Sequence, residues 1–180
     1  MMLPQIEKLR DMLNREEDSR AGAAVAVLLN SARNELRVLL VKRAVNPSDP
    51  WSGDIAFPGG KKHADDGSLR DTVVRETTEE TGIDLLRYEF LGTMEIMNSN
   101  VRPEMFILPF VVVCDEAPEV ILDDELCAYF WAPIEQLKQS RCKAKARQWE
   151  VSAFLIYGEV VWGLTYSILE NLIAMLDKTA

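Results

Sequence analysis

The chain has 180 residues and a mass of 20.4 kDa, which is enough for one domain with a substantial core. Hydrophobic residues make up 48% and charged residues 27%, an ordinary globular composition that excludes a wholly disordered or collagen-like chain. With 20 basic and 29 acidic residues the formal net charge is −9, which argues against nucleic acid and against an anionic membrane surface as partners.

The N-terminal segment, residues 1–20, alternates apolar and charged residues and is predicted to be an amphipathic helix rather than a signal peptide. We expect residues 21–180 to form a single domain. The three cysteines are widely spaced and the sequence has one histidine, so neither a disulfide framework nor zinc-finger spacing is present. A reducing, cytoplasmic compartment is therefore expected. The longest apolar runs are too short for a membrane span.

The first half of the domain has strand and turn signals. Residues 23–29 and 36–42 are predicted to form two strands, joined as a hairpin by the turn-rich segment 30–35. Residues 46–54 contain Pro47, Pro50 and Gly53 and are predicted to form a loop. A short strand over 55–57 should end at the Pro-Gly-Gly turn that follows.

The segment from Ser68 to Thr81 has strong helix punctuation. Ser68 is a good N-cap, and Asp71 lies three residues later, as in a capping box. Gly82 stands where a left-handed residue ends a helix. Leu69, Val73 and Thr72 would then point inward.

The second half continues with mixed elements. Strands are predicted over 88–98, 105–114 and 128–131, a short helix over 133–139 and a terminal helix over 165–176, whose apolar face is formed by Ile168, Leu169, Leu172, Ile173 and Leu176. The basic residues Arg141, Lys143, Lys145 and Arg147 are predicted to lie in a solvated loop. This order of strands and helices predicts an α/β/α sandwich with a mixed sheet.

Three carboxylates on the predicted helix 68–81 carry the chemistry. Glu76 and Glu80 lie one turn apart on one face, with Glu79 beside them. Their mutual repulsion, which Arg75 offsets only in part, would be relieved by a divalent cation, and Mg²⁺ or Mn²⁺ prefers such oxygen ligands. A lone acidic helix face is more often simply solvated. The flanking residues distinguish the two interpretations.

Those flanking residues make the stretch resemble the Nudix box, G-x5-E-x7-R-E-U-x-E-E-x-G-U with U aliphatic. The matching positions are Gly60, Arg75, Glu76, Glu79, Glu80, Gly82 and Ile83. The spacer 61–74 is one residue too long, so Asp65 or Asp66 would stand in for its glutamate, and Thr77 occupies the first aliphatic position.

The resemblance implies the Nudix fold and hydrolysis of a diphosphate linkage in a small nucleoside diphosphate derivative. Glu76 and Glu80 would be the main metal ligands, with a carbonyl of Gly59 or Gly60 completing the set. Glu79 would be a further ligand or would orient the attacking water, and Arg75 would hold the carboxylates in place. A homodimer is a further family habit.

Other residues have two interpretations each. Glu125 is a candidate general base or an ordinary exposed loop acid. Arg43 and Lys42 could contact a substrate phosphate or be surface cations, and the side-chain-free Gly59 would let a ligand approach the backbone. Four aromatic residues could stack on a base or serve only in packing, namely Trp51, Phe106, Trp149 and Tyr157.

The substrate stays open at this level. Residues 39–60 and 161–165 are similar to coenzyme A diphosphatases of the superfamily, but the segment from Asp49 to Asp54 stands where that subgroup carries an Arg and a His. Coenzyme A, nucleotide sugars, dinucleotides and oxidised nucleoside triphosphates are therefore all candidates. The rival hypothesis is a nucleotide-binding regulatory module without turnover, against which the intact carboxylates argue.

Overall fold

The computed structural model describes residues 4–31, 35–98 and 103–178. Within these residues a mixed sheet of eight strands forms the centre, with the order β3-β2-β1-β7-β5, while β8 pairs with β2, β4 with β1 and β6 with β7. The strands are β1 (Ala23–Asn30), β2 (Arg37–Arg43), β3 (Ile55–Ala56), β4 (Gly59–Lys61), β5 (Glu89–Thr93), β6 (Met97–Asn98), β7 (Phe106–Cys114) and β8 (Leu126–Pro133). The β1–β7 pair is parallel, and the other described pairs of this sheet are antiparallel.

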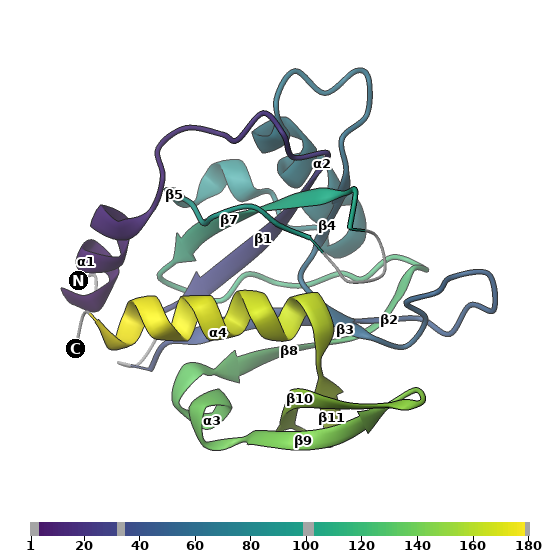
Figure 1. Cartoon of the computed structure of the whole chain (residues 1–180). Helices are drawn as coiled ribbons and strands as arrows, with labels where there is room; N and C mark the ends of the chain where they lie inside the picture. The colour runs from purple at the N-terminus through teal and green to yellow at the C-terminus, as the bar shows by residue number, and fades with distance from the viewer. Residues whose placement is uncertain (1–3, 32–34, 99–102, 179–180) are drawn as a thin grey trace.

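The sheet separates two hydrophobic clusters, because successive side chains of β1 point to opposite faces. Val27 and Leu29 belong to the cluster that contains the apolar faces of α1 (Pro4–Met12) and α4 (Gly163–Asp177). Ala26 and Leu28 belong to the cluster that contains the apolar side chains of α2 (Leu69–Thr81). Figure 1 shows α4 lying across the sheet on the near side. The predicted α/β/α sandwich with a mixed sheet is confirmed.

The helix predicted over 68–81 is also confirmed. The Ser68 hydroxyl accepts a hydrogen bond from the backbone N–H of Asp71, and Gly82 closes the helix at a φ of 69°. Leu69, Thr72 and Val73 are buried, as their spacing predicts. Local sequence signals therefore predicted both ends of this element.

The N-terminal helix is shorter than predicted. Helix α1 ends at Met12, and residues 1–3 lie outside the described part of the chain. After the helix, the backbone N–H and C=O groups of Asn14 pair with those of Thr93. The chain leaves the helix here because its backbone hydrogen bonds are made to the edge of the sheet instead. The predicted strand 88–98 is likewise divided into β5 and β6, and the turn predicted at 30–35 lies partly outside the described residues.

The main correction concerns the basic residues after α3 (Ile134–Gln139). Arg141, Lys143 and Lys145 do not lie in a solvated loop, because β9 (Arg141–Ala146), β10 (Trp149–Ile156) and β11 (Glu159–Val161) form a second, antiparallel sheet, whereas Arg147 lies in the exposed turn between β9 and β10. This small sheet lies at the bottom of Figure 1. Arg141, Lys143 and Lys145 are the exposed residues of β9 and alternate with less exposed ones. The alternation is a strand signal that the high charge obscured.

Two further observations bear on the sequence predictions. Cys114, Cys127 and Cys142 are free thiols, and Cys114 is buried. In the described segments we find no helix with the length and apolar character that crossing a membrane requires.

Candidate active site

Gly59 and Gly60, predicted to form a turn, instead begin strand β4, which lies between strand β1 and helix α2. Gly59 has a φ of 143°, and a Cβ atom there would lie 2.2 Å from the carbonyl oxygen of Ala24. A Cβ atom on Gly60 would lie 2.5 Å from the carboxylate carbon of Glu76. The absence of side chains therefore lets the β4 backbone lie directly against the acidic face of α2.

Glu80 is the buried member of the acidic face. Its residue is 6% exposed, and its Oε2 accepts a hydrogen bond of 2.9 Å from the backbone N–H of Gly59. Burial raises the pKa of Glu80 to about 8, and the neighbouring charge of Glu76 adds to the rise. A cation beside these two carboxylates would oppose both effects and favour the ionised form.

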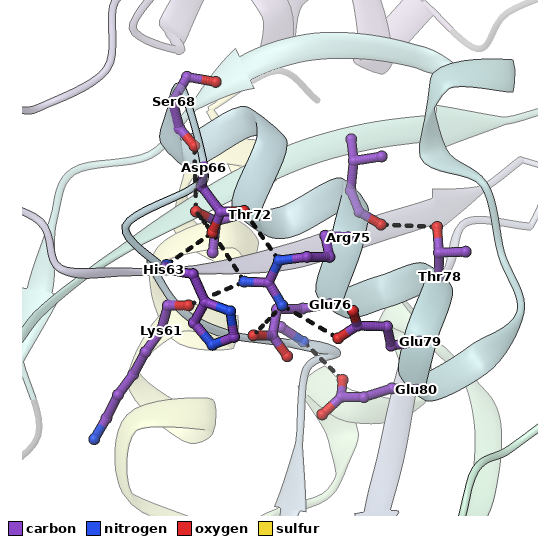
Figure 2. Close-up of polar contacts among 12 residues, drawn as sticks. Lys61, His63, Asp66, Ser68, Thr72, Arg75, Glu76, Thr78, Glu79 and Glu80 are labelled. Atoms are coloured by element: carbon purple, nitrogen blue, oxygen red, sulfur yellow. Dashed lines mark hydrogen bonds and ion pairs between the residues drawn. The ribbon is translucent and has the colours of Figure 1, made fainter.

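Arg75 occupies the centre of the polar cluster (Figure 2). Its Nη1 donates to Oε1 of Glu76 at 2.9 Å and to Oε2 of Glu79 at 3.1 Å. Its Nε and Nη2 donate to the two carboxylate oxygens of Asp66 at 3.0 and 2.9 Å. The guanidinium group thus holds two members of the acidic face and the spacer loop in one geometry.

Asp66, not Asp65, makes the salt bridge that the spacer of the box requires. It also accepts hydrogen bonds from the His63 backbone N–H and the Thr72 hydroxyl. The side-chain hydrogen bond from Arg75 holds the pKa of Asp66 well below its usual range. Asp66 is the sixth residue after Gly60, so the extra residue of the spacer lies beyond it and leaves the ion pair intact.

The carboxylates fit a divalent cation, although they do not converge as they stand. Among the described residues no group of three Asp, Glu, His or Cys side chains is arranged to hold a metal ion, because Glu76 and Glu79 bond to Arg75 while Glu80 bonds to the Gly59 N–H. The fit rests on Glu80, a buried acid whose ionisation Glu76 opposes. Oxygen donors of this kind suit Mg²⁺ or Mn²⁺.

Arg43 and Lys42, the two basic candidates of strand β2, lie in different surroundings. Arg43 lines the pocket beside Gly59 and Gly60, and its positive charge acts against the rise in the pKa of Glu80. Lys42 does not line that pocket, and its Nζ donates to Glu159 of β11 at 2.6 Å. Adjacent strand residues point to opposite faces, so only one of the pair can reach the acidic cluster.

Glu125 is exposed and lines a different hollow, which it shares with Arg43 and Asp124. Its carbonyl accepts the N–H of Ala44 at 2.8 Å, which ties its backbone to the residue after Arg43. Asp123 has a more direct connection to the acidic face. Its N–H donates to the Glu80 carbonyl at 3.1 Å, and its charge contributes to the raised pKa of Glu80. Asp123 was not among the candidates from the sequence, which named Glu125, two residues further on.

A pocket of about 240 Å³ lies beside Gly59 and Gly60 of β4. Apolar and aromatic side chains dominate its walls, among them Trp51, Ile55, Phe57, Trp162 and Leu164. Of the four rings considered from the sequence, only Trp51 lines it. Trp149 and Tyr157 are 61% and 56% exposed, and Phe106 is half-buried. Trp162 is not one of those four rings, although it lies in the segment 161–165 that is similar to coenzyme A diphosphatases.

A family model described as NUDIX domain matches residues 20–154. The chain belongs to the Nudix family. This confirms the family resemblance of the box, and the carboxylates described above are the acidic residues of that box.

Relatives of known sequence are consistent with this membership. The chain is 30% identical over 163 residues to the uncharacterized Nudix hydrolase NudL of Yersinia pestis, covering 85% of this chain and 77% of NudL. It is 28% identical over 163 residues to mitochondrial Nudix hydrolase 15 of Arabidopsis thaliana, covering 83% of this chain and 56% of that protein. An uncharacterized Schizosaccharomyces pombe protein is 33% identical over 115 residues, 60% of this chain and 35% of its own length. The chain therefore spans about a third to a half of the last two relatives.

Solved structures share the fold. The Mycobacterium smegmatis Nudix hydrolase RenU has a TM-score of 0.63 at 15% identity, covering 88% of this chain and 87% of its own. The NUDIX domain of Shewanella oneidensis NrtR, solved in complex with ADP ribose, has a TM-score of 0.54 at 20% identity, covering 90% and 89%. At these identities the likeness shows the Nudix fold and nothing finer.

Proposed function

We propose that this Nudix chain hydrolyses a diphosphate linkage in a small nucleoside diphosphate derivative, with Mg²⁺ or Mn²⁺ held mainly by Glu76 and Glu80. The observation that carries the proposal is the buried Glu80 carboxylate, placed between the Gly59 N–H and the charge of Glu76. A pure binding module would have no need of a buried acid that its neighbour makes hard to ionise. Family membership supports the same activity.

The residues around the acidic face would have separate roles in hydrolysis. A divalent cation at the acidic face would neutralise the charge that develops on phosphate oxygens during attack by water. Arg75 holds Glu76 and Glu79 at hydrogen-bond distance. The absence of a side chain on Gly60 leaves room for the Glu76 carboxylate beside the β4 backbone, and the Arg43 guanidinium is suited to a phosphate oxygen.

The proton of the attacking water needs an acceptor. Glu79 is exposed at the rim of the cluster and is therefore reachable by water and substrate. Glu125 would reach the substrate only from the neighbouring hollow, beside Arg43. Asp123 is the third candidate, because its backbone is bonded to Glu80. We place Glu79 first and the other two after it.

The substrate class is narrowed by resemblance only. The similarity of residues 39–60 to coenzyme A diphosphatases makes coenzyme A one candidate, beside nucleotide sugars and dinucleotides. We further propose that residues 21–180 act as one domain, in the cytoplasm and as a homodimer, on small molecules rather than nucleic acid.

The test is chromatographic detection of the two phosphorylated products that hydrolysis of the diphosphate linkage would give from each compound, using the purified chain with Mg²⁺ or Mn²⁺. Glu80→Gln should lower kcat/KM by at least about 100-fold, because loss of a metal ligand removes more than the 10–100-fold typical of its supporting residues. Glu150→Gln, an exposed acid of β10, is the matched control and should stay within twofold. Turnover of Glu80→Gln at the wild-type rate would refute the metal assignment. Binding of a compound without its hydrolysis would instead establish the regulatory module.

A further inference from the structure

Asp54 joins three segments that are far apart in the sequence. Its Oδ1 accepts a hydrogen bond of 3.2 Å from the indole Nε1 of Trp162, the N-cap residue of α4. Its Oδ2 accepts one of 3.1 Å from Nη2 of Arg147, which lies in the turn between β9 and β10. These hydrogen bonds connect the second sheet, through its β9–β10 turn, to the 46–54 loop and to the beginning of α4.

Arg147 makes two further contacts in the same place. Its Nη2 also donates to the carbonyl of Pro50, and its guanidinium carbon lies 5.3 Å from the centre of the Trp162 ring. Asp54 in turn donates its N–H to the carbonyl of Trp51 at 3.0 Å. The position of each tryptophan is therefore coupled to the Arg147–Asp54 ion pair.

These two tryptophans line the 240 Å³ pocket beside Gly59-Gly60. The indole N–H of Trp162 already donates to Asp54, so Trp162 can contact a ligand only through the surface of its ring. The pocket is smaller than the roughly 300–1,000 Å³ that encloses a drug-sized molecule, so it admits one ring system rather than a whole dinucleotide. Because Gly59 and Gly60 of β4 line the pocket, a ring bound there would lie next to the proposed diphosphate site.

By the proposed function the nucleobase of the substrate would lie in this pocket, and we propose that Asp54 and Arg147 are positioning residues, which set the separation of Trp51 and Trp162 there. The inference deepens the proposed function and rests on it. Indole rings stack on any nucleobase, because every base has a flat π-face. A flexible chain such as an acyl or thiol arm would gain less from two fixed rings and would lose rotamer freedom on entering. The β9–β10 turn thus contributes to specificity without touching the reacting atoms.

The test uses the full chain without divalent cations, so that binding is separated from hydrolysis. Calorimetric titration with AMP, GMP, CMP and UMP should give affinities at least tenfold above that of ribose 5-phosphate, which lacks the ring. Arg147→Ala and Trp51→Ala should each lower nucleotide affinity about tenfold and leave ribose 5-phosphate unchanged, whereas Trp51→Phe should restore most of the loss. Lys145→Ala, an exposed cation of β9, is the matched control and should bind as the wild type does.

Hydrolysis adds a second measurement. With a substrate that the wild type turns over, Arg147→Ala should raise KM about tenfold and keep kcat within about twofold, a split that general loss of folded protein would not produce. Equal affinity for nucleotides and ribose 5-phosphate, or wild-type nucleotide binding by Trp51→Ala and Arg147→Ala, would overturn the inference. Nucleotide binding that follows the expected pattern, in a chain that hydrolyses no compound tested, would refute the proposed hydrolase and leave the subsite standing.

Discussion

Glu17, in the segment that follows α1, caps the helix that carries the acidic residues. Its Oε2 accepts the N–H of Leu69 and its Oε1 the N–H of Arg70, each at 2.9 Å. Ser68 accepts the next N–H, that of Asp71. The first three N–H groups of α2, which lack partners within the helix, are therefore satisfied by two side chains that lie about fifty residues apart.

The magnitude follows from this geometry. Removing a side-chain cap costs about 0.5–2 kcal/mol, and an acid near a helix N-terminus contributes about 0.3–1 kcal/mol through the helix dipole. Glu17 is exposed, so we expect Glu17→Ala to lower the free energy of unfolding by about 1–2 kcal/mol. For a chain of this size that corresponds to roughly 2–8 °C in Tm. Glu17→Gln keeps one acceptor oxygen and loses the charge, so its free energy of unfolding should lie between those of the wild type and Glu17→Ala.

Urea denaturation followed by circular dichroism measures the difference. The matched control is Glu16→Ala, which removes the same charge from the adjacent exposed position and keeps the backbone carbonyl that accepts the Thr93 hydroxyl. If Glu17→Ala is no less stable than Glu16→Ala, the capping role is refuted.

Three further substitutions test the neighbouring contacts. Thr77→Val should raise the free energy of unfolding by about 1 kcal/mol in urea melts, because the buried Thr77 hydroxyl has no partner among the described residues; a loss of stability would show that the hydroxyl is bonded. Asp66→Asn should lower Tm at pH 7. Because Arg75 depresses the pKa of Asp66 in the folded wild type, the difference in Tm should shrink as the pH falls below about 4, where the carboxyl of the unfolded wild type takes up a proton. A pH-independent difference in Tm would contradict the ion pair. Gly60→Ala should weaken Mn²⁺ binding, measured by calorimetry, at least about tenfold while the circular dichroism spectrum is unchanged, because the added methyl group displaces the flexible carboxylate of Glu76 rather than backbone; unaltered Mn²⁺ affinity would remove Glu76 from the site.

The elements around the acidic cluster were accessible from short stretches of sequence. Ser68 and Gly82 mark the ends of α2, and the spacing of Glu76 and Glu80 put both acids on one face. The order of the predicted strands and helices then indicated the fold, and the box indicated the family. Such signals lie within a few residues of one another, and backbone geometry alone converts them into structure.

The environment of those residues was decided by tertiary structure. Asp65 and Asp66 were both left open from the sequence; counting from Gly60 favours Asp66, and the path of the spacer loop brings its carboxylate to Arg75. Arg43 and Lys42 were likewise equivalent until the pairing of β2 assigned each to one face of the sheet.

The pocket depends most on long-range contacts. Asp54 meets Arg147 across 93 residues and Trp162 across 108, through a second sheet whose first strand was hidden by its charge. Periodicity within a segment determined which faces are buried or acidic. Which distant side chains share a cavity was determined by how strands and loops pack, since that packing depends on the whole chain rather than on any one stretch of it.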